Sequence, residues 1–410
     1  KEYRRQRQMC IRDSYICISD DKGENIIQKT LPCSVHGNEV GRATGDRLIY
    51  KNGRLYFGSQ TAGIIYSEDM GDSWQSVDLF GEKNISLIWT DSEGKLFIAG
   101  CSGEANSPDG VTRGHTLYCS TDGLKSFVPL TAPDPVKYEN SSYYGFVPQR
   151  ITSDSRYIYI TFASSGEVFY GGMGAYACDT GSLSGGKVYR YRIENGVPVF
   201  NKDITPEDHI PCGYSGICSN GKMLLLSTVC RKNGGDIIYT STDSGESWKI
   251  IMNRLEYCRF DWNIPYMKPR YNGGGNCVHW ISDIKLSPFD SDTALFNTGT
   301  GLFMITGLAS GDVLVKPFCE GIEETVHLNV YTTPHGRNRI IDIIGDLGGF
   351  AFEDYDSECE NSFANENGDR YITCLNADLT LSDPEYIVAT PRGNWTGKTK
   401  GGLILSCLLY

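Results

Sequence analysis

Short runs of apolar, β-branched and aromatic residues recur along the chain, and Gly, Asn, Asp and Pro bound them. Examples are RLYFGS, YIYITF, KMLLLST and EYIVAT. Runs of this length and composition are typical of β-strands. The i, i+3, i+4, i+7 spacing of an amphipathic helix is never sustained beyond two turns. The pattern therefore predicts an all-β protein.

A motif of the form S-x-D-x-G-x-x-W follows a strand-like run at two places. Its residues are Ser67, Asp69, Gly71 and Trp74 in one copy, and Ser241, Asp243, Gly245 and Trp248 in the other. A weaker copy begins at Ser19 and has Ile26 in the aromatic position. Another begins at Ser120, with its glycine moved to Gly123 and Phe127 as the aromatic residue.

The four copies begin 48, 53 and 121 residues apart, and the last interval corresponds to two units. The run KVYRYR (187–192) supplies a strand for the unit that lacks the motif, and GLFMI (301–305) follows the final copy. Repeats of about 50 residues with several short strands each are typical of four-stranded propeller blades. The sequence thus predicts a β-propeller.

The motif resembles the Asp box of sialidases, sortilins and several glycosidases. Its aspartate accepts backbone N–H bonds inside a hairpin turn, its glycine takes a positive φ, and its aromatic ring packs between strands. We therefore expect Asp69 and Asp243 to be structural and not catalytic. The motif supports a propeller but does not identify an activity.

The composition narrows the range of partners. Among 410 residues, 47 are glycine and 25 are tyrosine, which fits a protein with many turns. The formal net charge of -12 argues against binding to nucleic acid or to an anionic membrane, whereas a neutral polysaccharide is compatible with it. No run of 18 apolar residues occurs, so no membrane-spanning helix is expected.

Fifteen cysteines are scattered without a CxxC pair or a zinc-type spacing, so we expect no metal and no cofactor. Their density indicates an oxidising compartment and several disulfides, and the alternative is buried free thiols in a cytosolic protein. Sequons at Asn84, Asn140 and Asn394 fit secretion. We expect a secreted monomer.

Both ends of the sequence are unusual. The opening KEYRRQRQMCIRDS (1–14) and the closing SCLLY (406–410) resemble translated sequencing-adapter reads. We interpret both as artefactual segments outside the fold. The remainder is then interpreted as an internal fragment of a longer protein.

Four segments resemble those of glycoside hydrolase family 74, the xyloglucan-active endoglucanases with two seven-bladed propellers. They are NEVGRATGDRLIYKNGRLYFGS (38–59), GYSGICSNGKMLLLST (213–228), HWISDIKLSPFDSDTALFNTGTGLF (279–303), and GIEETVHLNVYTTPHG with IIGDLGGFAFEDY (within 321–355). They occur in the family's order and cover about residues 15–405. The resemblance implies about six blades of a first propeller in residues 15–318 and the beginning of a second in 319–405.

In this family, hydrolysis inverts the anomeric centre with two aspartates, and the resemblance assigns the general acid to Asp346 in GDLGGF. The flanking glycines would let a sugar ring approach the backbone closely. The apolar neighbours would desolvate the carboxylate and raise its pKa; they are Ile343, Ile344, Leu347 and Phe350. The alternative is that Asp346 only caps a glycine-rich turn.

The family's general base lies in a segment resembling RTDIGGAYRW, and no such string occurs in this sequence. The resemblance therefore implies that the base belongs to a missing upstream segment. Other acidic residues near the matched segments are expected to make structural contacts; they are Asp283, Asp342, Glu323 and Glu324.

A polysaccharide cleft also needs aromatic platforms for the C–H faces of its sugars. Five residues in glycine-rich or loop-like stretches are candidates for substrate binding, and ordinary packing is the alternative for each; they are Trp280, Trp262, Tyr266, Tyr143 and Tyr144. Trp280 is the strongest candidate, and it stands in HWI where the family has GWM.

Other classes of propeller remain open. A sialidase would require an arginine triad around a carboxylate, and FVPQR (146–150) is only faintly similar to the corresponding segment. A sortilin-like binding propeller explains the Asp boxes but not the GIEET and GDLGGF segments. A polysaccharide lyase would require a Tyr or His base, whereas His209, His279 and His327 are isolated in the sequence and are expected to be structural.

Overall fold

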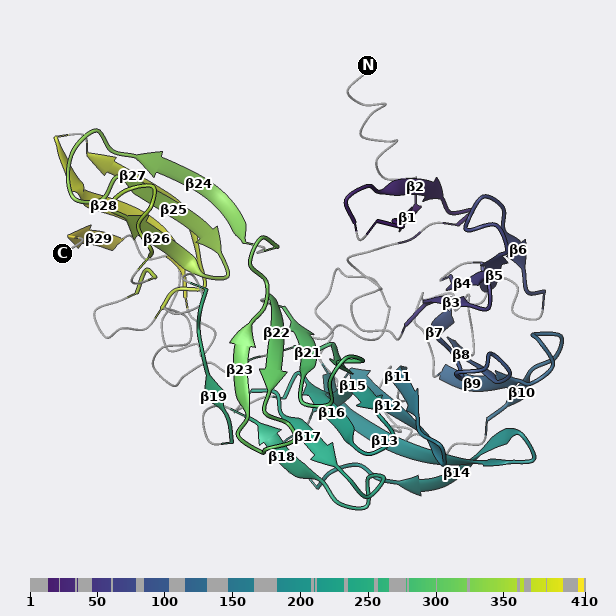
Figure 1. The fold of residues 1–410 in the computed structure, drawn as a ribbon. Coiled ribbons are helices and arrows are strands. Elements are labelled where there is room, and N and C mark those ends of the chain that lie inside the picture. The colour runs from purple at the N-terminus through teal and green to yellow at the C-terminus, as the bar shows by residue number, and fades with distance from the viewer. Residues whose placement is uncertain are drawn as a thin grey trace, which may run out of the picture. The chain divides into compact units, whose positions relative to one another are not determined.

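The computed structural model describes the greater part of the 410-residue chain. The described residues are 14–21, 23–33, 35, 46–59, 62–78, 85–102, 115–130, 147–165, 183–207, 210, 212–231, 235–253, 257–264, 278, 280–299, 301–322, 325–359, 362–364, 370–380, 382–393 and 405–408. Within them every regular element is a β-strand (Figure 1). None of the described residues forms a helix that is long and apolar enough to cross a membrane.

A pair of strands and three four-stranded sheets come first along the chain, and the pair and the first two of these sheets each contain an Asp box. The pair is β1 (Tyr15–Ile18) and β2 (Ile27–Thr30). The first full sheet has β3 (Leu48–Lys51), β4 (Arg54–Gly58), β5 (Ile64–Ser67) and β6 (Gln75–Ser76). The next has β7 (Ile85–Thr90), β8 (Phe97–Ser102), β9 (His115–Ser120) and β10 (Val128–Pro129). The third has β11 (Val147–Ser153), β12 (Tyr157–Ser165), β13 (Leu183–Glu194) and β14 (Val197–Asp203).

Three further sheets follow along the chain. One has β15 (Gly213–Ser219), β16 (Leu224–Val229), β17 (Ile238–Ser241) and β18 (Lys249–Met252). The next has the order β19 (Arg259–Phe260), β23 (Leu314–Pro317), β22 (Gly301–Thr306), β21 (Ala294–Thr298) and β20 (Asp283–Leu286). The last has β24 (Val326–Thr332), β25 (Ile340–Gly345), β26 (Gly348–Phe352), β27 (Thr373–Thr380), β28 (Asp383–Arg392) and β29 (Leu405–Leu408).

Two of these strands confirm predictions about the repeat. KVYRYR lies in β13, the third strand of the sheet that lacks an Asp box, and GLFMI lies in β22, the third strand counted from β20. In place of an Asp box, β13 and β14 are joined by Asn195 and Gly196, which both have positive φ. An Asn-Gly pair is the preferred sequence for a two-residue hairpin turn. The sheets are the blades of a β-propeller, as the repeat predicted.

In the first unit, the large hydrophobic clusters lie between consecutive sheets. Leu87, Ile98 and Leu117 of the β7–β10 sheet pack in one cluster with Ile160 and Tyr191 of the β11–β14 sheet. A second cluster joins the β11–β14 sheet to the β15–β18 sheet in the same manner. Because both faces of such a sheet are covered, β16 is buried at every position and its sequence LLLSTV does not alternate.

Charged groups on or next to the first strands of three sheets also form ion pairs. The Arg150 guanidinium on β11 lies with its Nε 3.2 Å from Asp283 Oδ2 on β20 and 3.5 Å from Asp46 Oδ1 just before β3. Lys285 of β20 approaches the same Asp283 carboxylate to 2.9 Å. Asp283 is therefore structural, as expected. Arg150, in the FVPQR segment, is held by two carboxylates of the protein, which does not favour a sialidase-type carboxylate grip.

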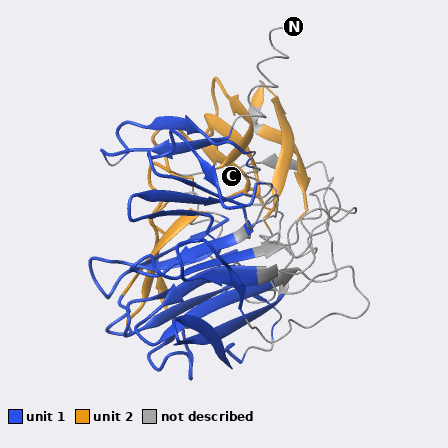
Figure 2. Ribbon diagram, turned by 90° about the vertical axis from the view of Figure 1, so that its right-hand side faces the viewer, with its two compact units in different colours: residues 1–253, 278–299, 307–311 blue, residues 254–277, 300–306, 312–410 orange. Residues whose placement is uncertain are grey.

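The chain divides into two compact units (Figure 2). The first comprises residues 1–253, 278–299 and 307–311, and the second comprises 254–277, 300–306 and 312–410. The predicted boundary between two propellers at residues 318 and 319 stays a prediction. Residues 1–13 lie outside the described residues. The interpretation of 406–410 as lying outside the fold does not hold for its described part, because residues 405–408 form β29 and pair with β28.

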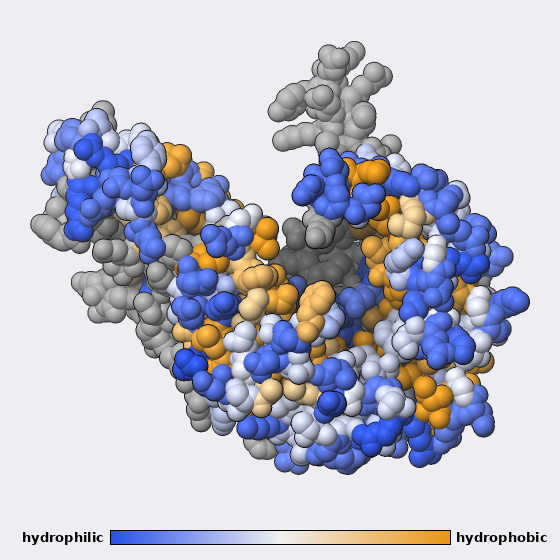
Figure 3. All heavy atoms as spheres, viewed as in Figure 1, coloured by the Kyte–Doolittle hydropathy of each residue, from blue (hydrophilic) through white to orange (hydrophobic). Residues whose placement is uncertain are grey.

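The surface agrees with the acidic composition. On the face shown in Figure 3, apolar side chains form separate patches between stretches of hydrophilic surface.

Among the described cysteines, several carry free thiols; they are Cys17, Cys33, Cys119, Cys218 and Cys374. Burial raises the pKa of Cys218 and that of Cys374 to about 12, so these two thiols stay protonated near neutral pH.

All four Asp boxes form the same turn. At the 241–248 turn, the Ser241 hydroxyl donates to Asp243 Oδ1 at 2.7 Å and accepts the Gly245 N–H at 2.9 Å. The Asp243 carboxylate accepts the Ser247 N–H at 3.0 Å and its hydroxyl at 2.5 Å. The Ser247 hydroxyl is the main cause that lowers the pKa of Asp243 to about 2. A carboxylate held ionised in this way stabilises the turn but is unsuited to donate a proton.

The Asp-box turn at Ser120 explains why its glycine is displaced. Two of the other turns have two successive residues with positive φ, Met70 and Gly71 in one and Ser244 and Gly245 in the other. In the Ser120 turn these two residues are Gly123 and Leu124. Either position can hold the glycine, because both are in the left-handed region that glycine favours. The shifted motif is therefore the same turn with the order of its two residues reversed.

We expect the Ser241→Ala variant to lower the free energy of unfolding by about 1–3 kcal/mol, because it leaves the buried Gly245 N–H without an acceptor. Ser19→Ala is the matched control, since Ser19 accepts the Gly23 N–H at 2.8 Å in an exposed turn where water replaces the hydroxyl. Urea unfolding of both variants measures the difference. Equal losses would show that burial of the turn does not matter.

Candidate functional site

The topology separates the two ends of each blade. In an antiparallel four-stranded sheet, the connections from first to second and from third to fourth strand lie at one end. The connection from second to third strand, and the one to the next sheet, lie at the other end. The Asp boxes join third and fourth strands, for example β5 to β6 and β17 to β18. The opposite end of each blade is therefore free of them.

The predicted site residues belong to connections of that opposite end, each within its own sheet. Asp346 joins β25 to β26, the second and third strands of their sheet. Trp280 precedes β20, a first strand, and Trp262 follows β19, which runs parallel to the fourth strand β23. The other three candidates lie outside the described residues, in the connection from β10 to β11 and in that from β19 to β20; they are Tyr143, Tyr144 and Tyr266.

Asp346 stands at the tip of the turn between β25 and β26. Its φ is 63°, in the left-handed region that non-glycine residues rarely adopt. The Asp346 N–H donates to the Thr373 hydroxyl at 3.0 Å, which fixes the turn to the start of β27. The residue is exposed. A strained backbone that presents an exposed carboxylate is a frequent feature of functional sites.

The surroundings of Asp346 differ from the expected apolar enclosure. Ile343 is buried in a cluster with β27 and β28, and Ile344 and Phe350 are buried in a separate cluster with Cys359 and the partly buried Leu347. The expectation that these side chains desolvate the carboxylate is therefore wrong, because strand alternation directs them into the sheet cores while the turn leaves Asp346 exposed.

The glycines that follow Asp346 are required by the protein's own packing. A Cβ on Gly348, whose φ is 81°, would lie 2.9 Å from the Tyr371 carbonyl oxygen. One on Gly349 would lie 2.7 Å from the Asp342 carbonyl oxygen and 3.0 Å from the Phe363 ring. The space that these glycines leave is thus occupied by the chain itself, and the expectation that it admits a sugar ring is not supported.

Asp342, on β25, is engaged with a histidine. Its carboxylate lies 2.8 Å from His327 Nδ1, and His327 Nε2 lies 2.6 Å from the Thr325 hydroxyl. Asp342 is buried, so it makes a contact within the blade, as expected. His327 is not isolated in the fold, and this pairing was not visible in the sequence. His209, His279, Glu323 and Glu324 lie outside the described residues.

Trp262 belongs to an aromatic cluster. Its ring stacks on Phe260 with centroids 4.9 Å apart and an interplanar angle of 5°, and it meets the Phe303 ring edge-on at 6.2 Å. These contacts use one ring face for packing. The structure thus gives Trp262 a definite packing role, while its function as a sugar platform stays a prediction.

Trp280 is partly buried and packs against Ala163, Val229 and Cys230. The ring lies over Gly299, where a Cβ would come within 2.7 Å of Trp280 Cε3. Its φ is 62°, so Trp280, like Asp346, lies in the left-handed region. Trp280 is therefore positioned by the ends of three neighbouring strands, β12, β16 and β21.

Asp236, a fully buried carboxylate in the first unit, was not predicted from the sequence. It is fully buried just before β17 and accepts the Ile281 N–H at 3.1 Å, the Thr228 hydroxyl at 3.0 Å and the Arg231 N–H at 3.0 Å. Burial raises the pKa of Asp236 to about 6 despite these bonds. The one sequence signal was an acidic residue directly before the apolar run of a strand.

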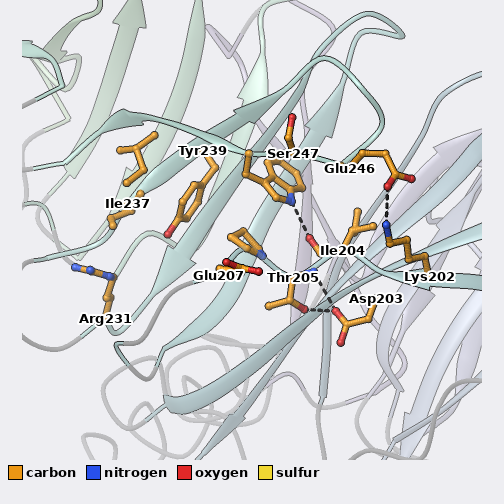
Figure 4. A pocket seen from close by; sticks show the side chains of 14 residues that line it. Lys202, Asp203, Ile204, Thr205, Glu207, Arg231, Ile237, Tyr239, Glu246 and Ser247 are labelled. Carbon is orange, nitrogen blue, oxygen red and sulfur yellow. Dashed lines mark hydrogen bonds and ion pairs between the residues drawn. The ribbon is translucent and has the colours of Figure 1, made fainter.

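A pocket of about 420 Å³ opens beside β14, β17 and β18 (Figure 4). Its polar groups bond to one another: Lys202 Nζ lies 2.5 Å from Glu246 Oε2, and Trp248 Nε1 donates to the Ile204 carbonyl at 2.7 Å. Of the residues singled out in the sequence, the pocket wall contains only the Asp-box residues Gly245 and Trp248. It holds none of the predicted substrate-binding residues and is not favoured as the site.

The Asp236 carboxyl should give the stability of the protein a characteristic pH dependence. The unfolded carboxyl loses its proton near pH 4, whereas the folded one keeps it to about pH 6. The unfolded state therefore binds fewer protons in this window, and stability falls by about 3 kcal/mol as pH rises from 4 to 6. Asp236→Asn should lack this component.

Urea unfolding of wild type and Asp236→Asn between pH 3.5 and 7 measures the difference between the two curves. Other titrating groups, including the Asp boxes below pH 4, are common to both proteins and cancel in that difference. Parallel curves from pH 4 to pH 6 would contradict the assignment.

Comparison with known proteins finds relatives along most of this chain. No family model matches it. The chain is 24% identical over 403 residues to an oligoxyloglucan-reducing end-specific xyloglucanase of Emericella nidulans, covering 84% of this chain and 48% of the relative. It is 23% identical to a xyloglucanase of a Paenibacillus species, covering 92% of this chain and 38% of the relative. The chain thus spans about half the length, or less, of the curated relatives it matches.

Two solved structures share the fold. A family 74 xyloglucanase from Xanthomonas campestris superposes with a TM-score of 0.71 at 21% identity, over 92% of this chain and 53% of that one. A family 74 enzyme from Niastella koreensis gives a TM-score of 0.69 at 20% identity, over 96% of this chain and 55% of that one. These matches confirm the resemblance that the motifs predicted: the chain is similar to xyloglucanases of glycoside hydrolase family 74 and shares their fold.

Proposed function

We propose that this chain is part of a secreted, monomeric glycoside hydrolase that cleaves the β-1,4-glucan backbone of xyloglucan, with Asp346 as its general acid. The relatives that cover most of this chain are named xyloglucanases, which supports the substrate. The observation that carries the role of Asp346 is its position in the GDLGGF turn, where a backbone with φ of 63° presents an exposed carboxyl group.

The proposed reaction uses two carboxyl groups on opposite faces of the sugar ring. The protonated Asp346 carboxyl donates its proton to the glycosidic oxygen as the bond from that oxygen to the anomeric carbon breaks. A second carboxylate takes a proton from a water molecule, whose oxygen bonds to the anomeric carbon. The two groups need a separation of about 6.5–9.5 Å to admit that water, and the anomeric configuration is inverted.

We propose that the second carboxylate comes from a segment of the longer protein that this sequence does not contain. Asp342 is a poor substitute, because it is buried and its oxygens already accept from His327. Asp283 is likewise engaged, with Arg150 and Lys285. The present chain alone is then expected to have little activity.

In the longer protein, Asp346→Asn should lower kcat on xyloglucan by about 10²–10⁴-fold, because the leaving oxygen no longer receives a proton. Release of reducing ends from xyloglucan, carboxymethylcellulose, sialosides and uronic-acid polymers measures both the rate and the substrate class. Asp383→Asn, an exposed aspartate on β28, is the matched control and should keep the wild-type rate.

A dinitrophenyl glycoside of a xyloglucan oligosaccharide sharpens this test. Its leaving group departs without protonation, so Asp346→Asn should retain most of the wild-type rate on it. Equal losses on the aryl glycoside and on xyloglucan would show that Asp346 is not the acid. Wild-type activity on sialosides or uronic-acid polymers alone would exclude the xyloglucanase proposal.

A further inference from the structure

Trp280 has a backbone conformation that its own sequence does not favour. A bulky aromatic residue with φ of 62° persists only where neighbouring groups hold it. Val278, two residues before Trp280, and Ile281, directly after it, are both buried, so the segment is anchored on each side of it. The contacts that hold the backbone at Trp280 come from Asp236.

The Asp236 carboxylate bonds to the backbone of this segment. It accepts the Ile281 N–H at 3.1 Å, and the Trp280 N–H also bonds to it. Two successive N–H groups converging on one anion form a backbone nest, which requires a left-handed residue in the pair. The Asp236 N–H in turn donates to the Val278 carbonyl at 3.0 Å. Asp236 therefore binds the segment before and after Trp280.

The carboxylate is itself fixed from the other side. The Thr228 hydroxyl, at the end of β16, donates to Asp236 Oδ1 at 3.0 Å, and the Arg231 N–H donates to the same oxygen at 3.0 Å. Thr228 also accepts the Ile237 N–H at 2.9 Å, so the hydroxyl is oriented. Asp236 thus links the connection between β16 and β17 rigidly to the segment that precedes β20.

The ring of Trp280 has little freedom once its backbone is held. Gly299 lies beneath it, and Ala163, Val229 and Cys230 pack against it. These residues pack against the ring, and the residue as a whole stays partly exposed. A ring packed in this way is pre-organised to stack on the C–H face of a sugar.

We propose that Asp236 is a positioning residue for substrate binding: its buried carboxylate holds Trp280 in the left-handed conformation that presents the indole as a sugar platform. Asp236 has no exposure and does not touch the substrate, so it acts only through Trp280. The inference rests on the proposed xyloglucan-hydrolase function, because that function supplies the ligand.

A double-mutant cycle tests the inference on the present chain. The probe is a xyloglucan oligosaccharide with a cellotetraose backbone, and calorimetric titration measures its Kd. Trp280→Ala should weaken binding about tenfold, the range expected for loss of one stacked ring, and Asp236→Asn about fivefold. The asparagine keeps the shape of Asp236 but replaces one acceptor by a donor that faces the Ile281 N–H.

The decisive result is the non-additivity of the two changes. In the Trp280→Ala background, Asp236→Asn should change Kd less than about 1.5-fold, because the group through which Asp236 acts is gone. Thr228→Val removes the hydroxyl bonded to Asp236 Oδ1 and should also raise Kd, by less than Asp236→Asn does. If Asp236→Asn fails to fold, the Kd of Thr228→Val tests the inference in its place. Ile98→Ala, in the core of another blade, is the destabilised control and should leave Kd unchanged.

Additive effects in the cycle, or wild-type Kd in Asp236→Asn or in a folded Thr228→Val variant, would overturn the positioning role. Absence of oligosaccharide binding by the wild-type chain would overturn it as well. Neither outcome affects the proposed hydrolase, which is judged separately by the Asp346 assays on the longer protein. In that protein, Asp236→Asn should raise KM about fivefold with kcat nearly unchanged, since it removes binding common to ground and transition states.

Discussion

The packing of each sheet against its neighbours is the constraint on which the first unit depends. The large clusters consist of side chains from two consecutive sheets, such as Ile98 with Ile160 and Tyr159 with Leu226. A fully buried side chain of this kind contributes about 1.5–3 kcal/mol, so both faces of a blade are committed to stability. Chemistry is then confined to the ends of the strands. The Asp-box turns use one end for structure, which leaves the other end, with Trp280 in the first unit and Asp346 in its own sheet, for function.

Three kinds of aspartate show how environment decides the role of one side chain. Asp243 is an exposed turn residue whose pKa is lowered to about 2, chiefly by the Ser247 hydroxyl. Asp236 is fully buried, and desolvation outweighs its hydrogen bonds and raises its pKa to about 6. Asp346 is exposed on a strained turn that a threonine hydroxyl holds in place. Asp346 therefore has an accessible carboxyl group on a backbone that is held in place, which a proton donor to a bound sugar requires.

The features predictable from the sequence are those that depend on neighbouring residues. The Asp box is closed within seven residues, so Ser241, Asp243 and Gly245 were recognisable without the fold, and the strand in KVYRYR followed from the length of the repeat. The contacts of Asp236 were not, because Ile281 lies 45 residues away in the chain. The pairing of His327 with Asp342 across 15 residues was missed for the same reason. The expected enclosure of Asp346 failed because composition near a residue does not tell which side of a sheet its neighbours face.

Strain connects the two proposed functional residues. Trp280 and Asp346 both have φ near +60°, and a non-glycine residue in this region costs about 1–3 kcal/mol and persists only where its surroundings impose the conformation. Each has a specific hydrogen bond that does so, from its own N–H to Asp236 or to Thr373. A relaxed backbone at either position would turn the side chain away from the direction it now has. The strain is therefore tolerated at these two places because orientation, and not burial, is what a sugar platform and a proton donor must supply.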